Sequence, residues 1–119
     1  KDFKIDIRGI SEIYHLACPT SAKNFDQLRM HTLHANAIGT INMLELAKFY
    51  KAKILFTSSS VVYGKRTENN PYFKETDFGL VDFVGPRACY DEGKRFSETA
   101  MITYRDVYKV DAKIARIFR

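Results

Sequence analysis

The chain has 119 residues, of which 45% are hydrophobic and 28% are charged. This length suffices for one domain, and this composition is typical of a globular protein and excludes wholesale disorder. The longest apolar runs have three or four residues, as at Ile54–Phe56, whereas a membrane span needs about 20. We therefore expect a folded domain with its own core and no contact with a membrane.

The charge pattern argues against a nucleic-acid partner. Nineteen Lys and Arg residues against fourteen Asp and Glu residues give a net charge of +5. The basic residues are dispersed in runs of at most two, whereas nucleic-acid-binding proteins gather them on one face. A mild positive charge suits small anionic ligands equally well.

Cysteine and histidine residues give weak signals. Cys18 and Cys89 form no CxxC pair, which indicates reduced thiols of a cytoplasmic protein. His31 and His34 are spaced to share a metal, but no third ligand stands near them in the sequence. We therefore expect no metal site.

The first half of the chain predicts a strand followed by a long helix. The apolar run Ile13–Ala17, closed by Cys18 and Pro19, predicts a buried strand. A helical pattern follows over 26–51. The predicted core face of this helix consists of Met30, Leu33, Ala37, Ile41, Leu44 and Ala47. The apolar strip beside it consists of Gly39, Met43, Leu46 and Tyr50. One strip suffices against a sheet, so the second predicts another helix as partner, such as one from a second subunit.

The second half repeats this order. Lys53–Ser58 predicts a second strand, and 112–118 predicts a third. The polar stretch 65–89 lacks periodicity and is too long for a simple connector, so we expect a functional loop on the substrate side. A helix is expected over 90–108. Its predicted core face consists of Phe96, Ala100, Thr103 and Val107.

This alternation predicts an α/β fold in the order strand, helix, strand, helix, strand, with a parallel sheet and right-handed crossovers. Ligands of such sheets bind at the carboxyl ends of the strands. In this chain those ends are Ala17–Cys18, Ser58–Ser60 and Phe118–Arg119.

Two groups of residues could carry chemistry. Tyr90 and Lys94 are four positions apart at a helix start, so both project from one helix face. A lysine ammonium near a phenol favours the phenolate. Thr57–Ser60 places hydroxyls at the end of a buried strand, where they can bind a substrate oxygen or a cofactor carboxamide. Each group alone also fits a surface pair or a polar strand end.

Taken together, these segments resemble the extended short-chain dehydrogenase/reductases, and within them the NAD-dependent epimerase/dehydratase family of nucleotide-sugar enzymes. The resemblance covers essentially the whole chain and implies a partial Rossmann-type domain. The segments that carry it are Tyr14–Pro19, Asn36–Thr40, Ser58–Gly64, Gly85–Arg95 and Ala115–Phe118. The segment Gly85–Arg95 looks most like the UDP-glucuronate decarboxylase (UDP-xylose synthase) branch.

The resemblance implies a role for individual residues. Tyr90 would be the catalytic acid/base that takes the proton of the sugar 4-hydroxyl while hydride passes to NAD. Lys94 would bind the cofactor ribose and lower the pKa of Tyr90, and Ser59 would orient the same hydroxyl. The further residues expected to line the cofactor are Leu16, Ala17, Asn36, Thr57 and Ser58. The residues expected near the nucleotide-sugar substrate are Thr20, Ser60, Arg87 and Arg119.

Two departures keep the reaction open. Decarboxylase and dehydratase branches carry an acidic residue directly before Val-Tyr-Gly, where this chain has Val61. A 4-epimerase needs no such acid, so we expect an epimerase/dehydratase-type enzyme, with UDP-glucuronate decarboxylase as the alternative. Arg119 stands where many members have Asn, and an arginine can still pair with a diphosphate.

The resemblance also implies parts that these residues lack. A Gly-rich turn for the cofactor pyrophosphate should precede them, and a C-terminal substrate lobe should follow them. We therefore expect 1–119 to be the central part of a larger NAD-binding domain. The parent would be a homodimer through the helices 26–51 and 90–108. A non-catalytic interaction domain of the same fold is the alternative from a different class.

Overall fold

The computed structural model describes residues 7–19, 26–69 and 71–118. Three strands, β1 (Glu12–His15), β2 (Lys53–Ser59) and β3 (Ala112–Ile117), form a parallel sheet in the order β1-β2-β3. Cα partners in the register include His15 with Phe56 and Ser59 with Ile117. The prediction of a parallel α/β sheet in this element order is therefore confirmed. The first strand ends at His15, two residues earlier than predicted.

The predicted helix 26–51 consists of four consecutive helical segments. They are η1 (Asp26–Leu28), α1 (Arg29–His34), the π-helical η2 (Ala35–Gly39) and α2 (Thr40–Tyr50). The second long helix, α3, spans Ala88–Tyr108. α2 and α3 end at Lys51 and Lys109, which adopt the left-handed conformation (φ 53° and 59°) that commonly closes helices. None of the helices in the described part is both long and apolar enough to cross a membrane.

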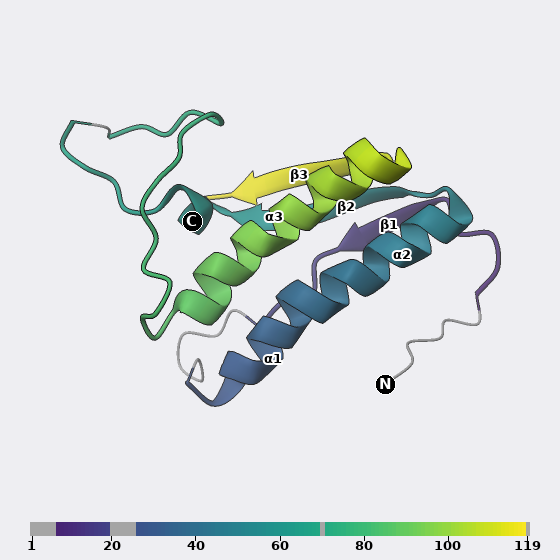
Figure 1. Ribbon diagram of the computed structural model, residues 1–119, viewed down its shortest axis with the longest axis horizontal. Helices are drawn as coiled ribbons and strands as arrows, with labels where there is room; N and C mark the ends of the chain where they lie inside the picture. Colours follow the sequence, from purple (N-terminus) through teal and green to yellow (C-terminus); the bar gives the residue numbers. More distant parts are fainter. Residues whose placement is uncertain (1–6, 20–25, 70, 119) are drawn as a thin grey trace.

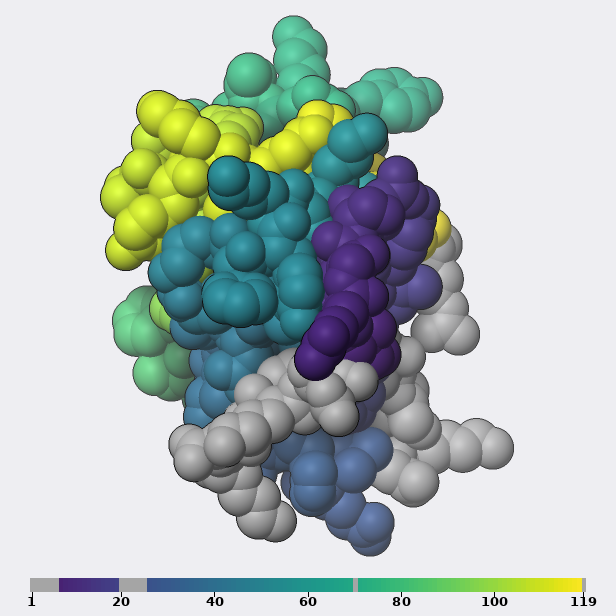
Figure 2. Space-filling view, turned by 90° about the vertical axis from the view of Figure 1, so that its right-hand side faces the viewer, coloured from purple at the N-terminus to yellow at the C-terminus, as the bar shows by residue number. Residues whose placement is uncertain are grey.

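The core lies between the sheet and the two long helices, which cover the same face of the sheet (Figure 1). β2 alternates, so that Ile54, Phe56 and Ser58 point into this layer while the side chains between them are half-buried. The buried apolar side chains of this layer are Leu44, Ala47, Ile54, Phe56, Ala100, Met101 and Val110. At the edge of the sheet, the segment 7–18, with its buried His15, lies beside the teal residues of the second half of α2 and of β2 (Figure 2).

The predicted core faces of both helices are partly wrong. Leu44 and Ala47 are buried as expected, but Met30 and Leu33 are 59% and 41% exposed. Polar side chains fill the N-terminal half of the buried face of this helix: Thr32, Asn36 and Thr40. On α3, Ala100 is buried while the other members of its predicted face are exposed: Phe96, Thr103 and Val107. Two of these polar residues bond across the elements: Thr40 Oγ1 lies 3.0 Å from Ser97 Oγ of α3, and the Asn36 oxygen accepts from Ser97 Oγ.

The segment 65–87, which we call the connecting loop, leaves η3 (Ser60–Tyr63) and returns to α3 (Figure 1). It is two residues shorter than predicted because α3 begins at Ala88. Glycines allow it to lie directly on η3: a Cβ on Gly79 would stand 1.5 Å from the Tyr63 oxygen, and one on Gly64 (φ +74°) 2.3 Å from the Leu80 oxygen. Arg95 Nη1 donates to the Gly79 oxygen at 3.1 Å and so fixes the loop to α3.

A second arginine fixes the other side of the connecting loop. Arg116 of β3 forms a two-pronged ion pair with Glu98 of α3, at 2.7 Å between Nη2 and Oε2. Its Nη1 donates to the Glu75 oxygen at 2.9 Å. The Arg116 guanidinium lies 4.6 Å from the Tyr63 ring centroid, and that ring stacks on Phe73. Loop, helix and sheet are thus joined where the strands end.

Candidate active site

Lys94 is a charged residue that lies buried without an ion pair in the described part of the chain. It lies in the second turn of α3, is only 3% exposed, and forms no ion pair with any described residue. Its Nζ donates to the Thr57 oxygen at 2.8 Å and lies 4.6 Å from the Phe56 ring centroid. Burial lowers the pKa of Lys94. An ammonium held dry with one of its three donors used can donate to a ligand at the end of β2.

Tyr90 lies one turn before Lys94, and the Lys94 Nζ is 5.8 Å from its ring centroid. The Tyr90 side chain is half-buried in the first turn of α3. The expectation that both residues occupy one helix face is therefore met. Their roles in catalysis stay predictions.

Ser59 is the last residue of β2 and the capping residue that precedes η3. Its Oγ accepts a hydrogen bond from the Val61 amide at 3.4 Å, which caps η3. Ser60, predicted near the substrate, is the first residue of η3. The sequence pattern Ser-Ser-Ser-x-Val-Tyr-Gly thus becomes a strand end followed by a short capped helix. Ser59 thus stands two residues after Thr57, whose backbone oxygen accepts the hydrogen bond from Lys94.

The expected cofactor-lining residues occupy three different environments. Leu16 and Ala17 follow β1 and are exposed. Thr57 offers its oxygen to Lys94, whereas Ser58 points into the core and its Oγ has no hydrogen-bond partner. Asn36 is buried, and its Nδ2 donates to the Thr32 oxygen at 3.1 Å and to Cys18 Sγ at 3.4 Å. Asn36 thereby ties the segment after β1 to the helix, which supports the edge where a cofactor would lie.

A buried polar chain connects β1 to α3. His15 Nε2 and Thr40 Oγ1 are 3.0 Å apart, and Thr40 Oγ1 is 3.0 Å from Ser97 Oγ. Ser97 Oγ also donates to the Asn36 oxygen at 2.7 Å. Gly93 sits directly on Asn36, since a Cβ there would stand 2.8 Å from Asn36 Nδ2. This chain of hydrogen bonds holds both helices against β1 next to Lys94.

His15 makes the stability of the fold pH-dependent. Burial and the nearby Lys94 ammonium hold the pKa of His15 below its ordinary value of 6.5. As the pH falls below about 6.5, the unfolded chain therefore binds a proton at His15 before the folded chain does. Acidification in this range favours unfolding. We expect the free energy of unfolding of the intact protein, measured with urea, to be lower at about pH 5.5 than at about pH 7.5.

The matched variants separate His15 from the other histidines. His15→Gln keeps a hydrogen-bonding group and should flatten this pH dependence. His31→Gln changes an exposed histidine of α1 and should leave it intact. An equal pH dependence in the wild type and His15→Gln would contradict the assignment.

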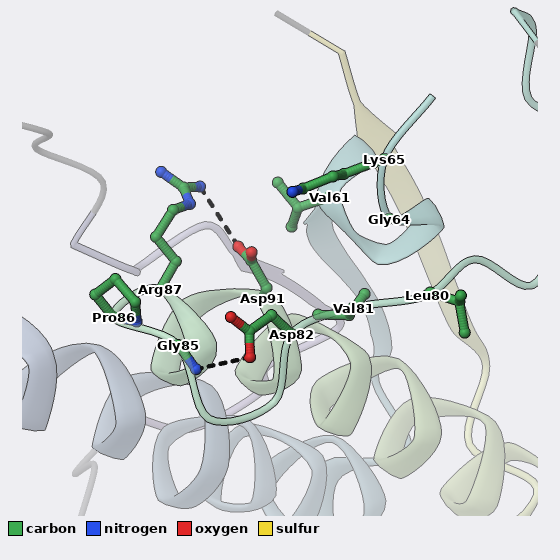
Figure 3. Close-up of a pocket in the computed structure, with 10 residues that line it drawn as sticks. All are labelled: Val61, Gly64, Lys65, Leu80, Val81, Asp82, Gly85, Pro86, Arg87 and Asp91. Atoms are coloured by element: carbon green, nitrogen blue, oxygen red, sulfur yellow. Dashed lines mark hydrogen bonds and ion pairs between the residues drawn. The ribbon is translucent and has the colours of Figure 1, made fainter. Parts of the chain in front are cut away.

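A pocket of about 390 Å³ opens between η3, the end of the connecting loop and the start of α3 (Figure 3). Its lining residues are Val61, Gly64, Lys65, Leu80, Val81, Asp82, Gly85, Pro86, Arg87 and Asp91. Ser59, Tyr90 and Lys94 are not among them, but Asp91 directly follows Tyr90 and Val61 stands two residues after Ser59. We call this hollow the loop pocket.

Charges in the loop pocket are mostly paired. Asp82 Oδ1 accepts from the Gly85 amide at 2.9 Å and from the Val84 amide at 3.1 Å. Asp91 pairs with Arg87 at 3.4 Å, and burial raises the pKa of Asp91. Lys65 pairs with no carboxylate of the described residues. In Figure 3 its side chain extends from the side of η3 toward Asp91.

Some predicted site residues lie elsewhere or were missed. Thr20 and Arg119 fall outside the described residues. Arg87 lines the loop pocket, as a substrate-side prediction would require. Lys65 and the Glu98–Arg116 pair were not anticipated, because no spacing in the sequence links residues that meet only through the fold. Within the described ranges, no three His, Cys, Asp or Glu side chains gather as a metal site.

The parallel sheet, the helices on it and the Lys94–Tyr90 pair at the strand ends define a Rossmann-type α/β domain of the short-chain dehydrogenase/reductase class. The family model described as GDP-mannose 4,6 dehydratase matches residues 5–119, and the chain belongs to this family. The expected epimerase/dehydratase kinship is therefore confirmed.

Relatives and solved structures agree with this membership. Over 109 residues the chain is 46% identical to UDP-glucuronic acid decarboxylase 1 of Arabidopsis thaliana and 47% identical to that of Xenopus tropicalis. Each match covers 92% of this chain and 25% of the relative, so the chain spans about a quarter of their length. The crystal structure of UDP-glucuronic acid 4-epimerase from Bacillus cereus in complex with NAD is 26% identical, with a TM-score of 0.71. That match covers 92% of this chain and 32% of the epimerase.

Proposed function

We propose that the protein oxidises the 4-hydroxyl of a nucleotide sugar with NAD and that Ser59, Tyr90 and Lys94 carry this step. The observation that supports it most is the buried Lys94 ammonium beside the Tyr90 ring and the Thr57 oxygen. A buried ammonium without a carboxylate is costly, and a bound ribose would use its remaining donors. The donor set therefore fits the cofactor.

The residues divide the step between them. Tyr90 Oη takes the proton of the 4-hydroxyl, Lys94 favours the phenolate by its charge, and Ser59 Oγ orients the hydroxyl. The bound nicotinamide would accept the hydride from C4. The cofactor-lining residues of this proposal are Leu16, Ala17, Asn36, Thr57 and Ser58. The substrate-side residues are Thr20, Ser60, Arg87 and Arg119.

Decarboxylation is the outcome that the relatives favour. A uronic acid oxidised at C4 is a β-keto acid, and it loses carbon dioxide readily because the electron pair delocalises into the ketone. Val61 stands where decarboxylases carry an acidic residue. Its absence slows the protonation of C5 that follows, but the loss of carbon dioxide stays possible. The 4-keto pentose is then reduced again, so the overall reaction consumes no cofactor.

Epimerisation at C4 is the second candidate, and Val61 favours it. The 4-keto sugar would turn over and be reduced on its other face, which requires no carboxylate at that position. Both reactions share the oxidation step and the same three residues.

Incubating the intact protein with NAD and UDP-glucuronic acid separates the candidates. We expect carbon dioxide and a UDP-pentose from a decarboxylase and UDP-galacturonic acid from an epimerase. If the protein neither binds NAD nor converts any nucleotide sugar, the oxidation proposal fails and a non-catalytic interaction domain takes its place.

We also propose a homodimer that forms through the two helical segments 26–51 and 90–108. Exposed apolar side chains on these segments support it: Met30, Leu33, Ile38, Phe96, Ile102 and Val107. A cytoplasmic location stays a prediction from the two free cysteines.

A further inference from the structure

The loop pocket carries a charge pattern that the oxidation step does not use. Two carboxylates line it, but both are engaged: Asp82 by two backbone amides and Asp91 by Arg87. The floor contributes the apolar Val61, and Lys65 brings an ammonium with no carboxylate partner among the described residues. The lining carries two cations and two carboxylates, so its formal charges balance, but the Lys65 ammonium forms no ion pair within the described residues and can pair with a carboxylate that a ligand brings.

The position of the loop pocket says which part of a substrate would reach it. It begins at Val61, two residues after Ser59, and at Asp91, the residue after Tyr90. If Ser59 and Tyr90 hold the 4-hydroxyl, the pocket adjoins C4 of the sugar. The groups on the two neighbouring carbons are the 3-hydroxyl and C6, and of these only C6 can carry a charge that the pocket would recognise.

We propose that Lys65 is a specificity-determining residue that binds a carboxylate at C6 of the sugar. This inference rests on the proposed function. In Figure 3 the Lys65 side chain extends from the side of η3 toward Asp91 and Arg87, and Lys65 is one of the residues that line the pocket. An ammonium attracts a uronate carboxylate there, whereas a neutral hydroxymethyl group gains little from it. The valine adds no charge that would repel the carboxylate.

Lys65 should act on binding rather than on the chemical step. It stabilises the carboxylate of the bound substrate, and in decarboxylation C6 departs as carbon dioxide while the negative charge passes through C5 to the oxygen at C4. An interaction present before the reaction lowers KM without raising kcat. The structure thus separates Lys65 from Tyr90, which acts on the proton of the 4-hydroxyl.

The test compares UDP-glucuronic acid with UDP-glucose by calorimetric titration of the intact protein, which needs no turnover. Lys65→Met should weaken binding of the acidic sugar about ten-fold and leave the neutral sugar nearly unchanged. Lys65→Arg should retain most of the preference. Lys74→Met, in the same loop but outside the pocket, is the matched control and should change neither.

Three results would overturn the inference. If Lys65→Met lowered the affinity for both UDP-sugars equally, Lys65 would be assigned to the diphosphate, which both substrates share. An unchanged affinity for both would remove Lys65 from the site while the oxidation proposal stands. If the wild type binds neither sugar, the proposed function fails and this inference fails with it.

Discussion

Tyr90→Phe is expected to lower kcat for nucleotide-sugar conversion by about 10²–10⁴-fold, because removal of the hydroxyl removes the acid/base group. The ring itself is retained, so its place beside the Lys94 ammonium, 5.8 Å from the ring centroid, should change little. Substrate and NAD should still bind with similar affinity. Steady-state rates and cofactor titrations on the intact protein measure both quantities.

Tyr108→Phe is the matched control for this change. Tyr108 lies on the same helix, is exposed, and is remote from the Lys94 turn along α3. The same loss of a phenolic hydroxyl should leave kcat within a factor of about two there, since surface changes rarely matter. If Tyr90→Phe retained full activity, Tyr90 would not be the proton acceptor and the assignment of the site would be wrong.

The order and type of the elements followed from the sequence because periodicity reports them directly. Short apolar runs gave β1, β2 and β3, and three- and four-residue steps gave the long helices. The pairing of Tyr90 with Lys94 was also predictable, because their spacing alone puts both on one face of a helix.

The buried faces of the helices were harder to predict. Thr32, Asn36 and Thr40 are polar but lie inside. Thr40 bonds to His15 of β1 and Ser97 of α3, and the Asn36 oxygen accepts from Ser97. Hydrophobic periodicity treats such residues as exposed. Only the fold brings Thr40 within 3.0 Å of both His15 and Ser97, so no local pattern could have assigned it to the core.

The same limit applies to the connecting loop. Its length and polarity indicated a functional segment, but its attachment depends on Arg95 and Arg116, which belong to α3 and β3. Arg116 contacts Glu98 and Glu75, residues 18 and 41 positions away. Contacts between residues so far apart in the sequence do not appear in any local spacing pattern. They nevertheless determine where the loop pocket forms.

Gly79→Ala should detach the connecting loop from η3. A Cβ at this position would lie 1.5 Å from the Tyr63 oxygen and 2.3 Å from the Tyr63 carbonyl carbon, and backbone atoms cannot yield as a flexible side chain can. The loop must therefore move away, which also breaks the bond from Arg95 to the Gly79 oxygen. We expect a loss of about 1–3 kcal/mol in the free energy of unfolding and faster proteolytic cleavage within 65–87.

Gly39→Ala tests whether that loss comes from the close approach or from the glycine itself. Gly39 has helical dihedral angles (φ −59°, ψ −46°), and its new Cβ would meet only the His34 oxygen at an ordinary 3.6 Å. Alanine there should stabilise the protein by about 0.5–1 kcal/mol through helix propensity. Urea unfolding and limited proteolysis of the two variants provide the comparison. Equal stability and equal protease resistance would mean that the loop does not depend on its contact with Tyr63, and the loop pocket would then lack a fixed wall.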